Sequence, residues 1–180
     1  MTKLPQEINT SIQDVHQFWE DFKDSFDDFS KKIGTTPKAS NIKNNPYANN
    51  SKYLEIGFIE MQLDRIYHGQ WSFEVTEVKL LLNAIQVTGH LSVLHPVSGT
   101  WIKRSGISAK ECQLKKGSTS IGVESLSSKA MERDVPIAKA EAFKNACKSL
   151  GNAFGRSLNR NFNHDFIPDL EVNKYGGVKV

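Results

Sequence analysis

Apolar and acidic positions follow a helical repeat near the start of the chain. Six apolar side chains are spaced by four and three residues in turn, with acidic side chains between them: Val15, Trp19, Phe22, Phe26, Phe29 and Ile33. This spacing predicts an amphipathic helix over residues 12–33 with an aromatic face. Ser11 and Asp14 are typical of its start, and Gly34 is typical of its end. Two interpretations stay open for the aromatic face: it packs on the core of its own subunit, or it docks on a neighbouring subunit or another protein.

The next two patterns are a polar stretch and a second helix. Residues 34–52 are polar and interrupted by two prolines, so we predict a linker or an extended arm. Over residues 53–67 the apolar side chains recur on one side of a helix, which residues 68–70 end.

Three stretches then alternate between apolar and polar residues, as half-buried strands do. They cover residues 71–75, 85–93 and 100–108, and a turn is predicted at residues 96–99. Gly89 interrupts the second stretch and is a candidate for a bulge or a bend. Because short connections join consecutive strands, we predict an antiparallel meander.

A helical pattern returns over residues 138–160. Apolar side chains recur there at steps of three and four: Ile137, Ala140, Phe143, Cys147, Leu150, Phe154 and Leu158. Lys144 and Lys148 lie four apart on another face. Gly151 and Gly155 interrupt the apolar face, and each costs a helix interior about 1 kcal/mol relative to alanine. We therefore predict one long helix, whose glycines let a second backbone come close.

Together these elements predict an α+β fold. An antiparallel three-stranded β-meander packs on the long helix, and the amphipathic helix precedes this core. The predicted division of the chain is an acidic helix at 1–33, a polar arm at 34–52, a core domain at 53–165 and a short tail at 166–180.

The charge is distributed unevenly. The chain has 23 basic and 20 acidic residues, which is too balanced to indicate a nucleic-acid partner by itself. The first 33 residues, however, hold four lysines and seven acids, so the rest of the chain has 19 basic and 13 acidic residues. An acidic amino-terminal arm thus precedes a basic body.

The remaining composition bears on the compartment. Cys112 and Cys147 have no metal-ligand spacing, and a buried reduced thiol is the ordinary state of such residues. The start of the chain lacks the apolar stretch of a secretory signal, and no apolar run approaches membrane-spanning length. We therefore expect a soluble protein of the cytoplasm.

Motifs for catalysis do not emerge from the sequence. The stretch Lys116-Gly117-Ser118 places its lysine before the glycine, unlike the loop that wraps nucleotide phosphates. The five histidines have no partner at metal-ligand spacing. We predict no catalytic residue, no metal site and no nucleotide cofactor, so ATP hydrolysis and nuclease activity are not expected.

The last helical pattern carries a more specific signal. Its stretch Leu-Gly-Asn-Ala-Phe-Gly at 150–155, preceded by Ala-Phe-Lys-Asn-Ala at 142–146, resembles the signature helix of the Rad fifty-two family of single-strand annealing proteins. His-Gly-Gln-Trp at 68–71 and Ser-Gly-Thr-Trp at 98–101 follow the family's order. The resemblance covers residues 53–160.

This resemblance implies a function. Members of the family bind single-stranded DNA and anneal complementary strands in recombination and repair, without ATP. It also implies a homo-oligomeric ring, in which a positively charged groove runs between the signature helix and a β-hairpin. Because the chain is about as long as the annealing domain, a phage or prophage recombinase in a bacterial host cell is the expected setting.

The resemblance and the charges together nominate DNA contacts. Lys144 occupies the first position of the family's basic pair, although Asn145 stands where the family has arginine. Lys148 matches a basic position one turn on, and Lys43 matches one ahead of the first core helix. Five further cations are candidates on charge alone: Lys103, Arg104, Lys129, Arg133 and Arg156. The first two are neighbours on a strand and point to opposite faces, so at most one shares a groove with the helix unless the chain bulges.

Two other functions fit the same sequence. One is a single-strand DNA-binding protein that coats DNA without annealing it. The other is an interaction protein, in which the acidic helix at 11–33 binds a protein partner and the basic body is incidental. Annealing assays, DNA-binding assays and deletion of residues 1–33 distinguish the three functions.

Overall fold

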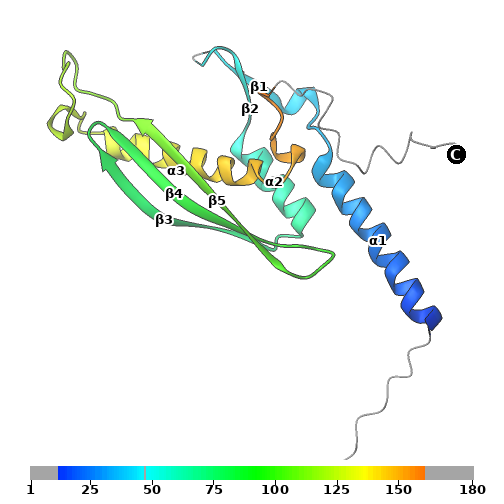
Figure 1. The fold of residues 1–180 in the computed structure, drawn as a ribbon. Helices are drawn as coiled ribbons and strands as arrows, with labels where there is room; N and C mark the ends of the chain where they lie inside the picture. Colours follow the sequence, from blue (N-terminus) through cyan, green and yellow to red (C-terminus); the bar gives the residue numbers. More distant parts are fainter. Residues whose placement is uncertain (1–11, 47, 161–180) are drawn as a thin grey trace, which may run out of the picture.

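The computed structural model describes residues 12–46 and 48–160. A three-stranded antiparallel sheet carries helix α3 on one face, and a long amino-terminal helix leads into this body (Figure 1). The helices are α1 (Ile12–Gly34), α2 (Ile56–Tyr67) and α3 (Ala130–Lys148). The strands are β1 (Ile42–Asn45), β2 (Ser51–Leu54), β3 (Trp71–Leu81), β4 (Ala84–Leu94) and β5 (Trp101–Glu111), and short 3-10 turns lie at η1 (Ala39–Asn41), η2 (Val123–Ser125) and η3 (Asn152–Phe154).

The predicted α+β class, antiparallel sheet, packed helix and amino-terminal helix are confirmed. The three strands pair in the order β3-β4-β5, and each is longer than its alternating stretch predicted. No helix among residues 12–46 and 48–160 is long and apolar enough to cross a membrane. The predicted cap at Ser11 and the predicted tail at 166–180 lie outside the described residues.

The core forms between the sheet and α3. Alternate side chains of the central strand β4 are fully buried: Ile85, Val87, Leu91 and Val93. Helix α3 faces them with small residues, because Ala138, Ala142 and Ala146 are also fully buried. Gly106 of β5 lies directly beneath the helix, where a Cβ would sit 2.9 Å from the Cβ of Ala146 and closer still to the Ala142 carbonyl oxygen. The helix and the strand therefore pack backbone to backbone at this point.

The prediction of one helix over residues 138–160 is wrong at both ends. Helix α3 starts earlier, at Ala130, and includes Pro136. Ala130 and Asp134 are buried, so the buried face of the helix begins before the predicted start. It stops at Lys148, and the glycines predicted in its interior lie in the turns that follow. Gly155 is left-handed at φ 83°, and Gly151 lies where a Cβ would be 3.1 Å from the Ile33 carbonyl carbon. Gly151 does admit a close backbone, that of α1, but outside the helix.

The segment at 34–52 is more ordered than a linker. It contains β1 and the first half of β2, which pair as an antiparallel hairpin with Asn49 and Asn50 left-handed in its turn. The helix predicted from Tyr53 therefore starts only at Ile56, because Tyr53 and Leu54 belong to the hairpin. Local polarity predicted a linker or an extended arm here, and pairing between β1 and β2 gives the stretch the structure of a hairpin.

The bulge predicted at Gly89 lies on the neighbouring strand. The register of β3 against β4 shifts between Val75 and Glu77, so no residue of β4 is paired with Thr76 in the ladder. Gly89 has a different role, because the ring of Phe73 on β3 occupies the space that its Cβ would fill.

Helix α1 packs on its own body only near its carboxyl end. Phe29 is buried in the core, and Ile33 packs against that core. The other half of the helix extends away from the body (Figure 1), and Phe18 and Trp19 are exposed there. The interpretation of packing on its own subunit thus holds for one half of the aromatic face.

His95 joins α1 to the turn that follows β4. Its ring centroid lies 4.4 Å from that of Phe29. Its Nδ1 accepts the backbone N–H groups of Val97 and Ser98 at 3.3 and 3.1 Å. Burial at this contact lowers the pKa of His95 below its usual value of 6.5.

We expect this histidine to make stability depend on pH. Its folded pKa is lower than its unfolded pKa, so the unfolded chain binds a proton that the folded chain resists. The free energy of unfolding is therefore highest, as far as His95 affects it, above about pH 6.5. It declines as the pH falls from there towards the folded pKa. Urea unfolding at about pH 7.5 and about pH 5.5 measures this loss. His95→Gln keeps an acceptor but does not titrate, and an equal loss in both proteins would contradict the assignment.

Candidate nucleic-acid interface

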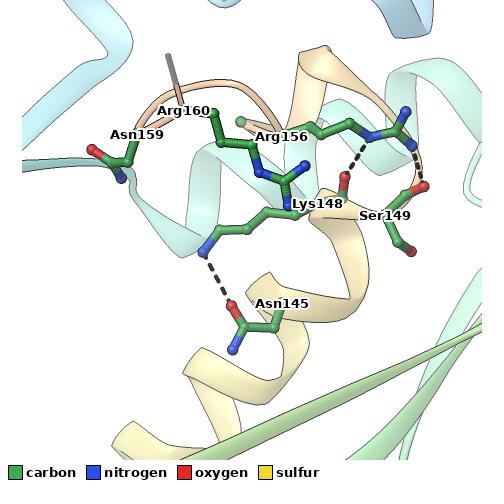
Figure 2. Close-up of a pocket in the computed structure, with 7 residues that line it drawn as sticks. Asn145, Lys148, Ser149, Arg156, Asn159 and Arg160 are labelled. Atoms are coloured by element: carbon green, nitrogen blue, oxygen red, sulfur yellow. Dashed lines mark hydrogen bonds between the residues drawn. The ribbon is translucent and has the colours of Figure 1, made fainter. Parts of the chain in front are cut away.

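A cationic cleft lies at the carboxyl end of α3, where the chain turns back after the helix (Figure 2). It has a volume of about 590 Å³ and seven lining residues: Asn145, Lys148, Ser149, Gly155, Arg156, Asn159 and Arg160. Three of these are cations whose N–H groups donate hydrogen bonds, and none is a carboxylate. Such donors bind phosphate oxygens, so the cleft is suited to a polyanion.

Arg156 neutralises the end of the helix beneath the cleft. The last carbonyls of a helix carry partial negative charge, which disfavours a phosphate nearby. Arg156 covers two of them, because its Nε donates to the Lys148 carbonyl at 3.2 Å and its Nη2 donates to the Ser149 carbonyl (Figure 2). The left-handed Gly155 makes the turn that brings this arginine back over α3. Arg156 therefore caps the carboxyl end of α3, and its side chain also lines the cleft.

Lys148 and Asn145 line the helical side of the cleft. The Nζ of Lys148 donates to the Oδ1 of Asn145 at 3.0 Å, a contact between exposed groups. The amide of Asn145 in turn donates to the carbonyl of Ile107 on β5 at 2.9 Å. The asparagine that departs from the family pattern therefore ties α3 to an edge strand and orients Lys148.

Asn159 attaches the β1–β2 hairpin to the other side of the cleft. Its side-chain amide accepts from the backbone N–H of Lys52 at 2.8 Å and donates to the Lys52 carbonyl at 2.7 Å. The amide therefore pairs with β2 as a neighbouring strand would. This places the hairpin beside Arg160 and the end of α3.

Lys144 does not line the cleft. Only 15% of its side chain is exposed, and its Nζ donates to the Oε1 of Glu141 at 3.0 Å. The Nζ also lies 5.5 Å from the centre of the Tyr53 ring on β2. The cation nominated first by the resemblance is thus paired and largely buried in this structure.

Lys43 lies on the hairpin face next to Lys144. It pairs across the hairpin with Tyr53, and directly opposed residues project from the same face. Lys43 therefore shares a hairpin face with Tyr53, whose ring contacts Lys144, and it does not line the cleft.

Lys103 and Arg104 point to opposite faces of the sheet, as their adjacency predicts. Arg104 pairs with the buried Leu91, on the face that carries α3, while Lys103 pairs with Ser92 on the other face. Burial raises the pKa of Tyr67 to about 12, and the positive charge of Arg104 opposes this shift. Arg104 is therefore near the end of the sheet that holds α2, and Lys103 is separated from the cleft by the sheet.

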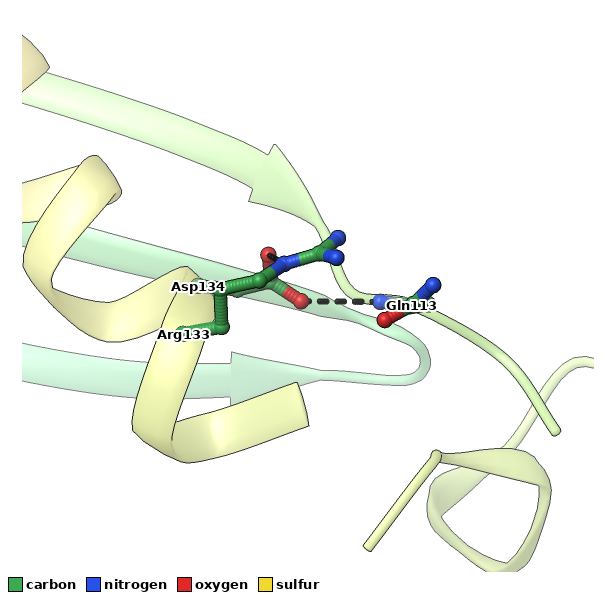
Figure 3. Close-up of polar contacts among 3 residues, drawn as sticks. All are labelled: Gln113, Arg133 and Asp134. Atoms are coloured by element: carbon green, nitrogen blue, oxygen red, sulfur yellow. Dashed lines mark hydrogen bonds and ion pairs between the residues drawn. The ribbon is translucent and has the colours of Figure 1, made fainter. Parts of the chain in front are cut away.

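Lys129 and Arg133 lie at the opposite end of α3. Arg133 and Lys148 are separated by fifteen residues of one helix, or about 22 Å. The Nε of Arg133 lies 3.4 Å from Oδ1 of the fully buried Asp134, whose Oδ2 accepts the backbone N–H of Gln113 (Figure 3). These contacts hold the loop after β5 on α3. The structure does not bring this pair of cations to the cleft.

Sequence reasoning named Lys148 and Arg156 but missed Arg160 and Asn159. The sequence predicted that both residues lie at the end of a long helix. That position does not bring them to a cleft. The available signal was the pair of glycines, Gly151 and Gly155, which break the helix and turn the chain back.

Neither a comparison with protein-family models nor one with curated proteins finds a match for this chain. The family resemblance therefore rests on the motifs within residues 53–160 alone.

Proposed function

We propose that this protein binds single-stranded DNA through the cationic cleft at the end of α3 and anneals complementary strands without ATP. The supporting observation is the make-up of the cleft: Lys148, Arg156 and Arg160 converge there, and no carboxylate lines it. Bound phosphates would displace counterions from the DNA, so binding weakens steeply with salt.

The cleft fits a backbone better than a base. Its polar donors suit phosphate oxygens, and none of its seven lining residues is aromatic, whereas proteins that hold bases stack them on aromatic rings. A strand held by its phosphates leaves its bases free for pairing. Base pairing then supplies the driving force, and the protein contributes by holding strands open and close together.

The finer features of the resemblance belong to the same proposal. The sheet and α3 would be the β-meander and long helix of an annealing core, repeated around a homo-oligomeric ring. One cleft is short, so the ring would supply a longer track for the strand. The setting would be phage or prophage recombination in the cytoplasm of a bacterial host.

The test is annealing of two complementary fluorescent oligonucleotides at low salt without ATP. We compare the wild type with Lys148→Glu/Arg160→Glu, which spares the capping Arg156. The matched control is Lys116→Glu/Lys129→Glu, because both lysines are exposed and Lys129 lies at the far end of α3. We expect the cleft variant to lose most of the acceleration and the control to keep it. Losing two phosphate contacts should also lower the salt slope of binding by about 1.4.

The other outcomes select the alternatives. Tight binding without faster pairing would indicate a single-strand DNA-binding protein that does not anneal. Absence of both binding and annealing in a folded wild type would refute the proposal and favour an interaction protein. Equal losses in the cleft variant and the control would show that overall charge, not the cleft, governs binding.

A further inference from the structure

The projecting half of α1 exposes an aromatic ladder. Val15, Phe18 and Trp19 are exposed by 44%, 61% and 59%. Further aromatic rings continue this surface towards the body. The ring centroid of Phe22 lies 6.4 Å from that of Phe18, 6.0 Å from that of Trp19 and 6.5 Å from that of Phe26. A contiguous apolar surface of this kind marks an interaction site. The same segment is acidic, because residues 14–24 contain four acids and one lysine.

A groove lies at the base of the same helix, between α1, α2 and the turn after β4. Its volume is about 650 Å³, and its apolar lining includes Phe58, Met61 and Ile66 of α2. Met61 is 54% exposed, and methionine adapts its shape to aromatic partners.

The rim of this groove is cationic. Lys32, Lys38 and Arg65 line it, and no carboxylate does. All three are exposed, and none forms an ion pair among the part of the chain that the structure describes. The groove, with its apolar lining and its three cations, is therefore complementary to the aromatic, acidic half of α1 in both hydrophobicity and charge.

The ladder cannot fill the groove of its own chain. Trp19 and Lys32 belong to one continuous helix and are thirteen positions apart, which corresponds to about 20 Å along its axis. We propose that the projecting half of α1 docks in the groove at the base of α1 of a second copy of this chain. The contact is head-to-tail, because the two surfaces differ, and such contacts repeat into a ring or an open filament. It involves neither the cleft nor DNA.

Sedimentation velocity on the full chain without DNA tests the docking. The ladder variant is Phe18→Asp/Trp19→Asp, and the groove variant is Lys32→Glu/Arg65→Glu. We expect the wild type to self-associate and each variant to raise the dissociation constant at least about tenfold, as loss of an aromatic or arginine anchor does. Leu82→Asp, at a 67% exposed turn position, is the control for the ladder, and Lys116→Glu/Lys129→Glu is the control for the groove. Both controls should assemble normally, and circular dichroism reports folding.

Mixing the two variants is the decisive measurement. The groove variant keeps an intact ladder and the ladder variant keeps an intact groove, so a 1:1 mixture should form a dimer that grows no further. A wild type that stays monomeric, or a groove variant that assembles as the wild type does, would overturn the proposal. So would two monomeric variants that fail to pair, and a partner of other composition would then be the occupant of the ladder.

Discussion

Gly106→Ala is expected to destabilise the fold by about 2–3 kcal/mol, the upper range for an overpacked core. The new methyl group would meet the backbone of α3 at Ala142 and Ala146. Backbone atoms cannot rotate away as a side chain does, so the helix would have to lift off β5. Because natural domains are stable by only about 5–15 kcal/mol, such a loss is large. Urea unfolding followed by circular dichroism measures it.

Gly57→Ala is the matched control for that experiment. Gly57 lies in the first turn of α2, is exposed, and has no atom within 4 Å of the position of its missing Cβ. Alanine is favoured over glycine in a helix by about 1 kcal/mol, so this variant should be neutral or more stable. Equal effects of the two substitutions would show that the close approach of α3 to β5 does not limit stability.

Asp134→Ala is expected to cost about 1.5–3 kcal/mol, the range for a hydrogen bond to a charged group. The carboxylate is fully buried, and its Oδ2 accepts the Gln113 N–H at 2.9 Å (Figure 3). Without it, the loop after β5 loses its attachment to α3. We therefore expect faster amide exchange at Gln113 as well as a lower free energy of unfolding.

Asp134→Asn separates the hydrogen bond from the charge. The asparagine keeps an oxygen of similar position for the Gln113 N–H but removes the ion pair with Arg133. Because Arg133 is largely exposed, that pair contributes little. We expect the asparagine variant to recover most of the stability lost with alanine. A full loss with asparagine would assign the effect to the charge.

Much of the fold follows from local patterns. Helices α1 and α2 and strands β3 to β5 arise where apolar side chains repeat every three to four or every two residues, a period that depends only on neighbouring residues. The end of α3 could not be predicted from such a pattern, because the apolar repeat continues past Lys148 to Leu158. The helix stops where Gly151 packs on the end of α1, a contact between segments far apart in the sequence.

The candidate site shows the same division. Lys148 and Arg156 could be named as cations from the sequence, but the roles of the basic residues depend on their partners. Lys144 pairs with Glu141 and contacts the Tyr53 ring, so it does not line the cleft. Arg156 donates to the carbonyl of Lys148 and so caps helix α3. Asn159 joins the cleft through Lys52, 107 residues earlier.

The sequence by itself determined helices α1 and α2, strands β3 to β5, the basic body, the acidic aromatic helix and the nomination of Lys148 and Arg156. Each depends on the composition and spacing of nearby residues. Only the tertiary structure decided where α3 ends, which cations converge, and which half of α1 stays uncovered. These features depend on contacts between distant segments, whose energies outweigh local preferences of about 1 kcal/mol per residue.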